Sequence, residues 1–226
     1  MMRGTSLNEP GRRRATELAA GEPFGVGIKD HEGDPDYDGR LLRGERTRRH
    51  IAQAMIELIE EGNPRPTARL IAERAGVSLR LVFHHFDDVE EVFVEGAVVQ
   101  AQRHWKKVVA VPPTGTILDR IEVICRQRRQ LFVAITPVRR AFRSRASESE
   151  TVTTTQMLEV ANHLLREQLA ETFAPELTAA GDDSDILLDA IDSATCWETW
   201  DTLRTGRRTA IAAQRIFQFS LTALLT

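Results

Sequence analysis

The sequence has few cysteines, few aromatic residues and no long apolar run. Its two cysteines, Cys125 and Cys196, have no close-spaced partner, which argues against a disulfide framework or a zinc site and indicates reduced thiols. No apolar segment approaches the ~18 residues that a membrane-spanning helix needs. The first residues lack the apolar stretch of a signal peptide. These absences argue against membrane and secreted classes, and we expect a cytoplasmic protein.

The net charge of the chain is also small. The formal net charge is −3 and the sequence pI is about 6.1, so the chain as a whole is not built to coat nucleic acid non-specifically, although one module can still carry a local basic surface. Of the 226 residues, 42% are hydrophobic. That is enough for the core of one large or two small domains.

Residues 1–43 differ in composition from the rest of the chain. They combine an arginine run, Arg12 to Arg14, with a stretch rich in Gly, Pro and Asp. Too little apolar surface is present to offset the entropy of ordering, so we expect a disordered tail. The alternative is a basic arm that reaches DNA, as the arms of homeodomains reach the minor groove.

The remainder of the chain predicts an all-α fold. Apolar residues recur at helical spacing, as Ile51, Met55, Leu58 and Ile59 do, and strand-like alternation never persists. Residues 146–155 are polar and predict a loop or a frayed helix start. The predicted helices are 44–61, 67–75, 78–86, a long one from Asp87 towards Pro112, 116–136 ended by Pro137, 138–145, 157–173, 182–203 and 207–225.

Residues 67–86 have the outline of a helix-turn-helix. Thr67 and Ser78 are each suited to cap a helix N-terminus, because a side-chain oxygen can accept from an otherwise unpaired backbone N–H. Gly76 lies between the two helices, where a tight turn can use positive φ.

The second helix of this pair has two different faces. At about 100° per residue, Val82 and Phe86 share a side suited to a core. Arg80 and His84 share another side, with Phe83 beside Arg80. The recognition helix of a helix-turn-helix enters the major groove, where an arginine can donate two parallel hydrogen bonds to guanine O6 and N7. Arg80 is therefore the candidate for reading guanine.

The segment GVSLRLVFHHF, preceded by IAERA, resembles the DNA-binding signature of the TetR/AcrR family of transcriptional regulators, IA..AGVS....LY.HF. Two positions depart from that family. Phe83 replaces the usual tyrosine and Val89 replaces a common lysine, and each change removes a contact to phosphate. The matching residues are Ile71, Ala72, Ala75, Gly76, Val77, Ser78, Val82, Phe83, His85 and Phe86.

The resemblance implies a three-helix DNA-binding head over residues 44–90 and a helical domain for ligand binding and dimerisation over 91–226. The helix after the head would carry the signal of a small, apolar effector, which releases a repressor from a near-palindromic operator. It implies no cofactor. The predicted DNA contacts are Thr67, Arg69, Ser78, Leu79, Arg80, Leu81, Phe83, His84, His85, Arg46 and Arg49.

The run Arg46, Arg48 and Arg49 precedes the first apolar stripe, where cations oppose the helix dipole. A nearby phosphate would explain it, and a solvated charge run is the alternative.

The last two helices are the expected dimer interface, because the C-terminal one is apolar over more than one face. The alternative is that these residues form internal core alone. A ligand pocket is expected between the helices of the same domain, although each candidate can equally be ordinary core. The interface candidates are Ile191, Trp200, Ile211, Phe217 and Leu221. The ligand candidates are Trp105, Phe132, Phe142, Met157, His163 and Trp197.

Catalytic and metal-binding patterns are missing from the sequence. No HExxH spacing, Gly-rich phosphate loop or nucleophile elbow occurs, so we expect no enzyme and no metal site. Two alternatives to a repressor stay open. One is an all-helical protein–protein interaction module without sequence-specific DNA binding. The other is an activator that needs its ligand in order to bind DNA.

Overall fold

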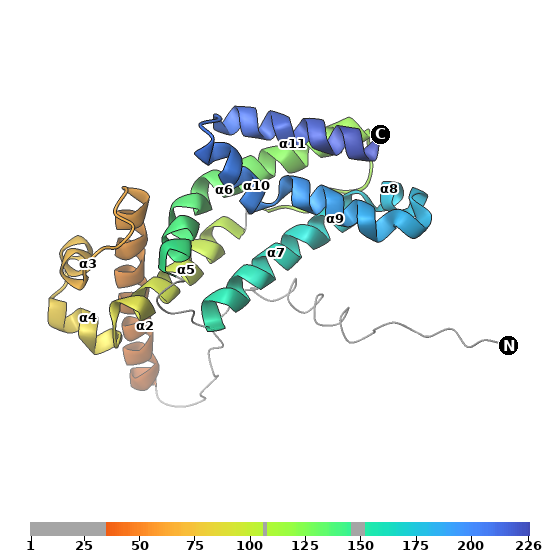
Figure 1. Ribbon diagram of the computed structural model, residues 1–226. Coiled ribbons are helices and arrows are strands. Elements are labelled where there is room, and N and C mark those ends of the chain that lie inside the picture. The colour runs from red at the N-terminus through yellow and green to blue at the C-terminus, as the bar shows by residue number, and fades with distance from the viewer. Residues whose placement is uncertain (1–34, 106–107, 146–151) are drawn as a thin grey trace.

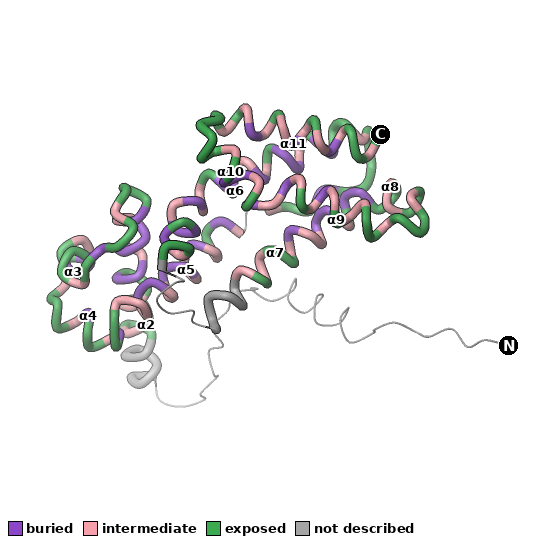
Figure 2. Tube along the Cα trace, viewed as in Figure 1, coloured by how far each residue is buried: buried purple, intermediate pink, exposed green. Residues whose placement is uncertain are grey.

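The computed structural model describes residues 35–105, 108–145 and 152–226. Every regular element in these ranges is a helix, so the predicted all-α fold is confirmed. The helices form a small head and a larger body (Figure 1). Each part has its own apolar core, and Figure 2 shows buried segments in both.

The head consists of α2 (Pro35–Glu60), α3 (Ala68–Ala75), α4 (Leu79–His85) and the first part of α5 (Val89–Trp105). These helices bury one set of apolar side chains because each carries an apolar stripe on its inner face. The set includes Ile51, Met55, Ile71, Val82, Phe86 and Phe93.

Helix α2 begins earlier than the sequence predicted. It starts at Pro35, so the expected disordered tail was wrong for residues 35–43, and residues 1–34 lie outside the described part. Extending a helix that already exists avoids the unfavourable nucleation step. Proline is also favoured at the first helical position, where no N–H is needed.

The body contains a second core around three aromatic rings. Phe132, Trp200 and Phe217 are buried and contact one another, with ring centroids 5.9 to 6.5 Å apart. The body helices are α6 (Ile117–Arg145), α7 (Val152–Thr172), α8 (Ala174–Ala179), a 3-10 turn (Gly181–Asp183), α9 (Ser184–Thr195), α10 (Trp197–Thr205) and α11 (Ala210–Leu225).

Helix α5 is shorter than predicted, because it ends at Trp105 and not near Pro112. Tertiary contacts hold the following segment in an irregular conformation. Val111 is buried in the body core, and the side-chain amide of Gln168 donates to the carbonyl of Val109 at 2.9 Å. The β-branched residues of this segment also have lower helix propensity.

Helix α6 continues through Pro137, where the sequence predicted two separate helices. A proline inside a helix removes one hydrogen bond. Packing on both sides of Pro137 offsets that loss: Phe132 belongs to the body core, whereas Val138 and Ala141 belong to the head core.

The predicted helix 182–203 is divided in two, and Cys196 between α9 and α10 has an extended backbone. The break lets Trp197 and Trp200 both enter the body core. The indole Nε1 of Trp197 donates to Thr136 Oγ1 at 3.1 Å. Helix α11 begins at Ala210, later than predicted, because the Thr209 hydroxyl caps it by accepting from the Ala212 N–H at 3.1 Å.

Candidate nucleic-acid interface

The predicted helix-turn-helix is present with both of its caps. Thr67 Oγ1 accepts from the Leu70 N–H at 3.4 Å, and Ser78 Oγ accepts from the Leu81 N–H at 3.1 Å. Gly76 has φ of 63°, the left-handed conformation that ends α3, which glycine adopts without a steric cost. The turn chemistry read from the sequence is confirmed.

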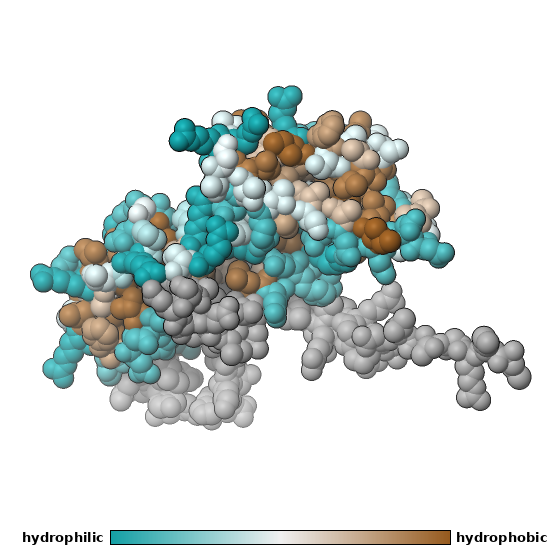
Figure 3. All heavy atoms as spheres, in the orientation of Figure 1, coloured by the Kyte–Doolittle hydropathy of each residue, from teal (hydrophilic) through white to brown (hydrophobic). Residues whose placement is uncertain are grey.

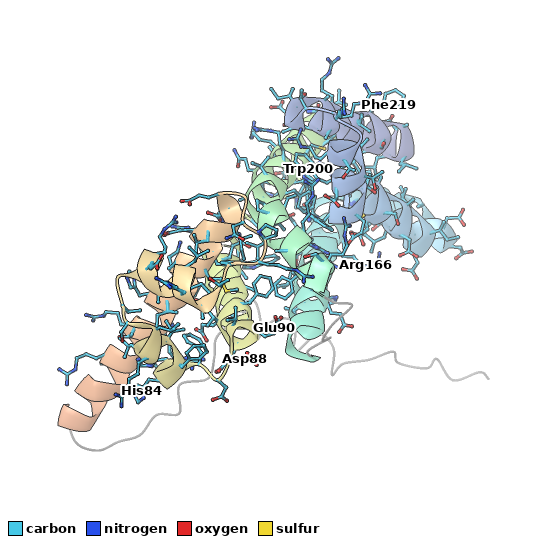
Figure 4. The ribbon with its side chains drawn as sticks, turned by 60° about the vertical axis from the view of Figure 1, so that its left-hand side comes forward. His84, Asp88, Glu90, Arg166, Trp200 and Phe219 are labelled. Atoms are coloured by element: carbon cyan, nitrogen blue, oxygen red, sulfur yellow. The ribbon has the colours of Figure 1, made fainter. Side chains whose placement is uncertain are left out.

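The two faces of α4 also lie as predicted. Val82 and Phe86 are buried at 1% exposure each and fix the helix to the head core. Arg80 and His84 are exposed on the opposite side, and His84 is labelled at the outer end of the head in Figure 4. Leu79 and Phe83 are 43% and 50% exposed. The exposed face of α4 therefore offers a cationic stripe beside an apolar stripe.

Arg48 joins α2 to the end of the recognition helix α4 and to the start of α5. Its guanidinium donates to the His85 carbonyl and to Glu91 Oε1, the latter at 2.9 Å. It also stacks 4.2 Å from the centroid of the Phe86 ring. These internal contacts make Arg48 a positioning residue for α4, so the phosphate hypothesis fails for this member of the arginine run.

The other predicted basic contacts remain available. Arg46 and Arg49 are exposed. Arg69 is 82% exposed and forms a helical ion pair with Glu73 at 3.1 Å, which is weak at such exposure and can yield to a phosphate. Thr67 and Ser78 are exposed as well, and their hydroxyl protons can still donate.

Leu81 and His85 are half-buried, so both are less accessible than the rest of the predicted contact set. Burial, together with the charges of His84 and Arg48, lowers the pKa of His85. The imidazole of His85 is thus favoured in its neutral form.

Val89, which replaces the family's lysine, packs against the head core. The substitution therefore adds apolar contact at the start of α5. That helix start is held by Asp88 and Glu91. Asp88 Oδ1 accepts from the Glu91 N–H, and Glu91 Oε2 accepts from the Asp87 N–H, each at 2.8 Å. The backbone bond from Asp87 is the first cause that lowers the pKa of Glu91, and the Arg48 guanidinium adds to it.

Residues 51–95 match the family model described as bacterial regulatory proteins, tetR family. The match spans the C-terminal part of α2, the whole helix-turn-helix and the start of α5. This segment is a TetR-family DNA-binding domain. The chain is therefore a DNA-binding transcriptional regulator whose head is of the TetR type, as the resemblance predicted.

Comparison with curated proteins finds no significant match. Among solved structures, one described as a TetR-family transcriptional regulator from Mesorhizobium loti MAFF303099 is similar to this chain. The two share 20% identity with a TM-score of 0.49, over 81% of this chain and 96% of the other. In the described ranges, no helix combines the length and apolar character of a membrane span.

The body of the protein contains a cavity of about 90 Å³ between α5, α6 and α7. Two of the six predicted ligand residues, Trp105 and Phe142, line it. Phe132 and Trp197 are buried elsewhere in the body core, and His163 is exposed and paired with Glu167 at 3.2 Å. These three residues do not line this cavity, and periodicity alone could not show which buried face borders it. The side chain of Met157 lies outside the described part.

The sequence reasoning missed three polar residues of the cavity wall: Gln100, His104 and Arg139. All three are buried. Gln100 and His104 lie four residues apart on the apolar face of α5, with Phe93 and Gly96. Polar residues on an otherwise apolar stripe were the signal that could have found them, because a buried polar group needs a partner or a function.

Four of the five predicted interface residues are also corrected. Ile191, Trp200, Phe217 and Leu221 are at most 1% exposed and form the body's own core, so a partner subunit cannot reach them. Ile211 is exposed. The exposed apolar residues that the prediction missed on α9 and α11 are Ile186, Phe219 and Leu224.

Proposed function

We propose that α4 lies in the major groove of an operator and that its N-terminal half reads the bases. The observation that carries this proposal is the exposed face of α4, on which Arg80 stands next to Phe83 while Val82 holds the helix to the core. A guanidinium suits guanine, and an apolar side chain suits a thymine methyl group. The head would thus contact the bases of the operator as well as the DNA backbone.

The supporting contacts come from residues around α4. Thr67 and Arg69, at the start of α3, are exposed and would contact phosphates next to an inserted recognition helix. Arg46 and Arg49 extend the cationic surface along α2 and supply phosphate contacts in place of those lost at Phe83 and Val89. Phosphate contacts set affinity and its salt dependence, whereas base contacts set specificity.

A homodimer would present two such heads to a near-palindromic operator. Its proposed interface is the exposed apolar face of α9 and α11, which pack against each other. Ile186, Ile211 and Phe219 are 67%, 66% and 77% exposed on this face. Hydrophobic residues gather over the C-terminal helices in Figure 3, and Phe219 lies far from His84 in Figure 4.

The cavity is the proposed effector site of a repressor, because its wall is shared with the head. Val138 lines the cavity and belongs to the head core, and the Phe142 ring contacts the Phe93 ring, with centroids 4.3 Å apart and the planes tilted by 54°. Gln100 donates to Glu60 at the end of α2 and to the carbonyl of Ala134 in α6, at 3.3 and 3.4 Å. An effector that prefers a different arrangement of these contacts would shift the head away from its DNA-binding position.

Selection of bound sites from random DNA tests this function. We expect a near-palindromic site, and a failure to enrich any site would contradict the proposal. Arg80→Ala should cost ~1–3 kcal/mol and relax specificity at one base position per half-site. Arg69→Ala is the matched control: it should weaken binding to all sequences alike and flatten the salt dependence.

A further inference from the structure

The cavity wall carries charge of one sign. Its lining includes ten apolar residues and three polar ones, and no carboxylate is among them. Arg139 supplies the full positive charge, while Gln100 and His104 are neutral or cationic groups on the facing helix α5. A buried apolar space with one cation is matched by an apolar molecule that bears one anion.

Only one of the three guanidinium nitrogens of Arg139 donates hydrogen bonds within the described part of the chain. Arg139 is 8% exposed, yet Nη2 makes both of its hydrogen bonds, to Asn162 Oδ1 at 3.3 Å and Glu198 Oε1 at 3.0 Å. Within the described part of the chain, Nε and Nη1 donate to no acceptor. Neither nitrogen is among the fully buried atoms without a partner, so both keep some accessible surface through which an acceptor can approach the guanidinium.

The counter-ion of Arg139 can be exchanged. Glu198 is 59% exposed, so its carboxylate can turn into water when another anion approaches the guanidinium. The buried Arg120 differs, because Nη1 and Nη2 are both held, by Glu176 at 2.8 and 2.6 Å and by the Thr172 carbonyl at 2.8 Å. Arg120 completes an internal ion pair, whereas Arg139 faces a cavity.

We infer that this cavity binds a small organic monoanion whose carboxylate meets Arg139 and whose short apolar tail lies against Trp105 and Leu131. This inference rests on the proposed function, since it names the chemical class of the effector. The volume of about 90 Å³ is less than the ~150 Å³ of a dry cavity that takes benzene. An apolar tail of roughly three or four carbons fits this limit, with the carboxylate beside Arg139 at the cavity wall.

Calorimetric titration of the full chain tests the ligand class. Butyrate and pentanoate are the probes, with butan-1-ol and butylamine as matched neutral and cationic molecules. We expect the acids to bind at least about tenfold more tightly, the size of one lost charge-assisted hydrogen bond. Equal binding of acid and alcohol, or no binding of either acid by a folded chain, would overturn the inference.

Three variants assign the binding to Arg139. Arg139→Met should reduce butyrate affinity at least about tenfold. Arg143→Met is the control, because Arg143 lies one turn further along α6, is 62% exposed and pairs with Asp201 away from the cavity wall. Glu198→Gln removes the competing carboxylate and should tighten binding by about threefold or more.

If the Arg139–Glu198 pair only stabilised the fold, the variants would show a different pattern of unfolding temperatures and butyrate affinities. Arg139→Met and Glu198→Gln would then lower the unfolding temperature alike, and Glu198→Gln would leave butyrate binding unchanged or weaker, which overturns the inference.

The titrations contain no DNA. A chain that binds butyrate but selects no DNA site would refute the proposed function alone, and a chain that selects a site but binds no acid would refute this inference alone.

Discussion

At the scale of single residues, the exposed face of α4 determines what the head can read. Leu79 and Phe83 are four positions apart and about half-exposed, and Arg80 and His84 form the adjacent stripe. Apolar side chains on a recognition helix gain contact area from thymine methyl groups, whereas cations gain from guanine or phosphate. The proposed function thus assigns two kinds of base contact to neighbouring stripes of a seven-residue helix.

Replacing a contacted thymine of the selected operator by deoxyuridine should weaken binding about fourfold, or ~0.8 kcal/mol, because one methyl contact is lost. Phe83→Ala should bind both operators equally weakly. Fluorescence anisotropy measures the difference, and thymines outside the half-sites serve as the control. If no thymine in the half-site shows the effect, the apolar stripe does not read bases.

His85 gives the head a pH dependence whose sign follows from its lowered pKa. Below the ordinary pKa of about 6.5, the unfolded chain binds a proton more readily than the folded one. Stability is therefore fully present above that pH and decreases as pH falls through it. We expect thermal unfolding between pH 8 and 5.5 to show this decrease, and His85→Gln to reduce it. His163→Gln, an exposed change in α7, should keep the wild-type slope.

At the scale of helices, two glycines show how closely packed the head is. A Cβ at Gly96 would lie 2.9 Å from Ile56 Cδ1 and 3.2 Å from the Ala52 carbonyl oxygen, so α5 crosses α2 there with no space for a methyl group. A Cβ at Gly44 would meet His85 Cε1 at an ordinary 4.0 Å. The same amino acid is thus required at one position and merely tolerated at the other.

The same substitution at these two sites should change stability in opposite directions. Gly96→Ala should lower the free energy of unfolding by about 1–3 kcal/mol through overpacking. Gly44→Ala should raise it by about 0.5–1 kcal/mol, because alanine loses less backbone entropy in a helix. Urea unfolding measures both. Equal effects of the two changes would show that α2 and α5 do not cross as closely as described.

At the scale of the whole molecule, the DNA-binding head and the apolar face of α9 and α11 lie at opposite ends (Figure 4). The body between them contains the cavity and the long helix α6, which contributes to both cores. Under the proposed function, a change at the cavity would reach the head through packed side chains, and the proposed dimer interface at the far end would set how two heads are spaced.

Phe219→Asp should convert the protein to a monomer, because a carboxylate cannot be buried in an apolar interface without a partner. Sedimentation velocity would measure the mass, and operator affinity should fall with it. Val109→Asp is the control at another exposed apolar position and should leave the mass unchanged. A dimer that survives Phe219→Asp would place the interface elsewhere.

The sequence alone predicted the head in detail, because its signals are local. The caps at Thr67 and Ser78, the turn at Gly76 and the two faces of α4 all depend on residues within four positions of one another. Such contacts form whenever the helix forms. That is also why the family signature could be recognised in one short segment.

The tertiary structure determined the features that depend on contacts between residues far apart in the sequence. Arg48 turned inward because His85 and Glu91 lie close to it in space. Helix α6 passed through Pro137, and Trp200 and Phe217 entered the body core and not a dimer interface. The residues Gln100, His104 and Arg139 gathered around one cavity. None of these outcomes is set by spacing along the chain, because each depends on which elements pack together once the local helices have formed.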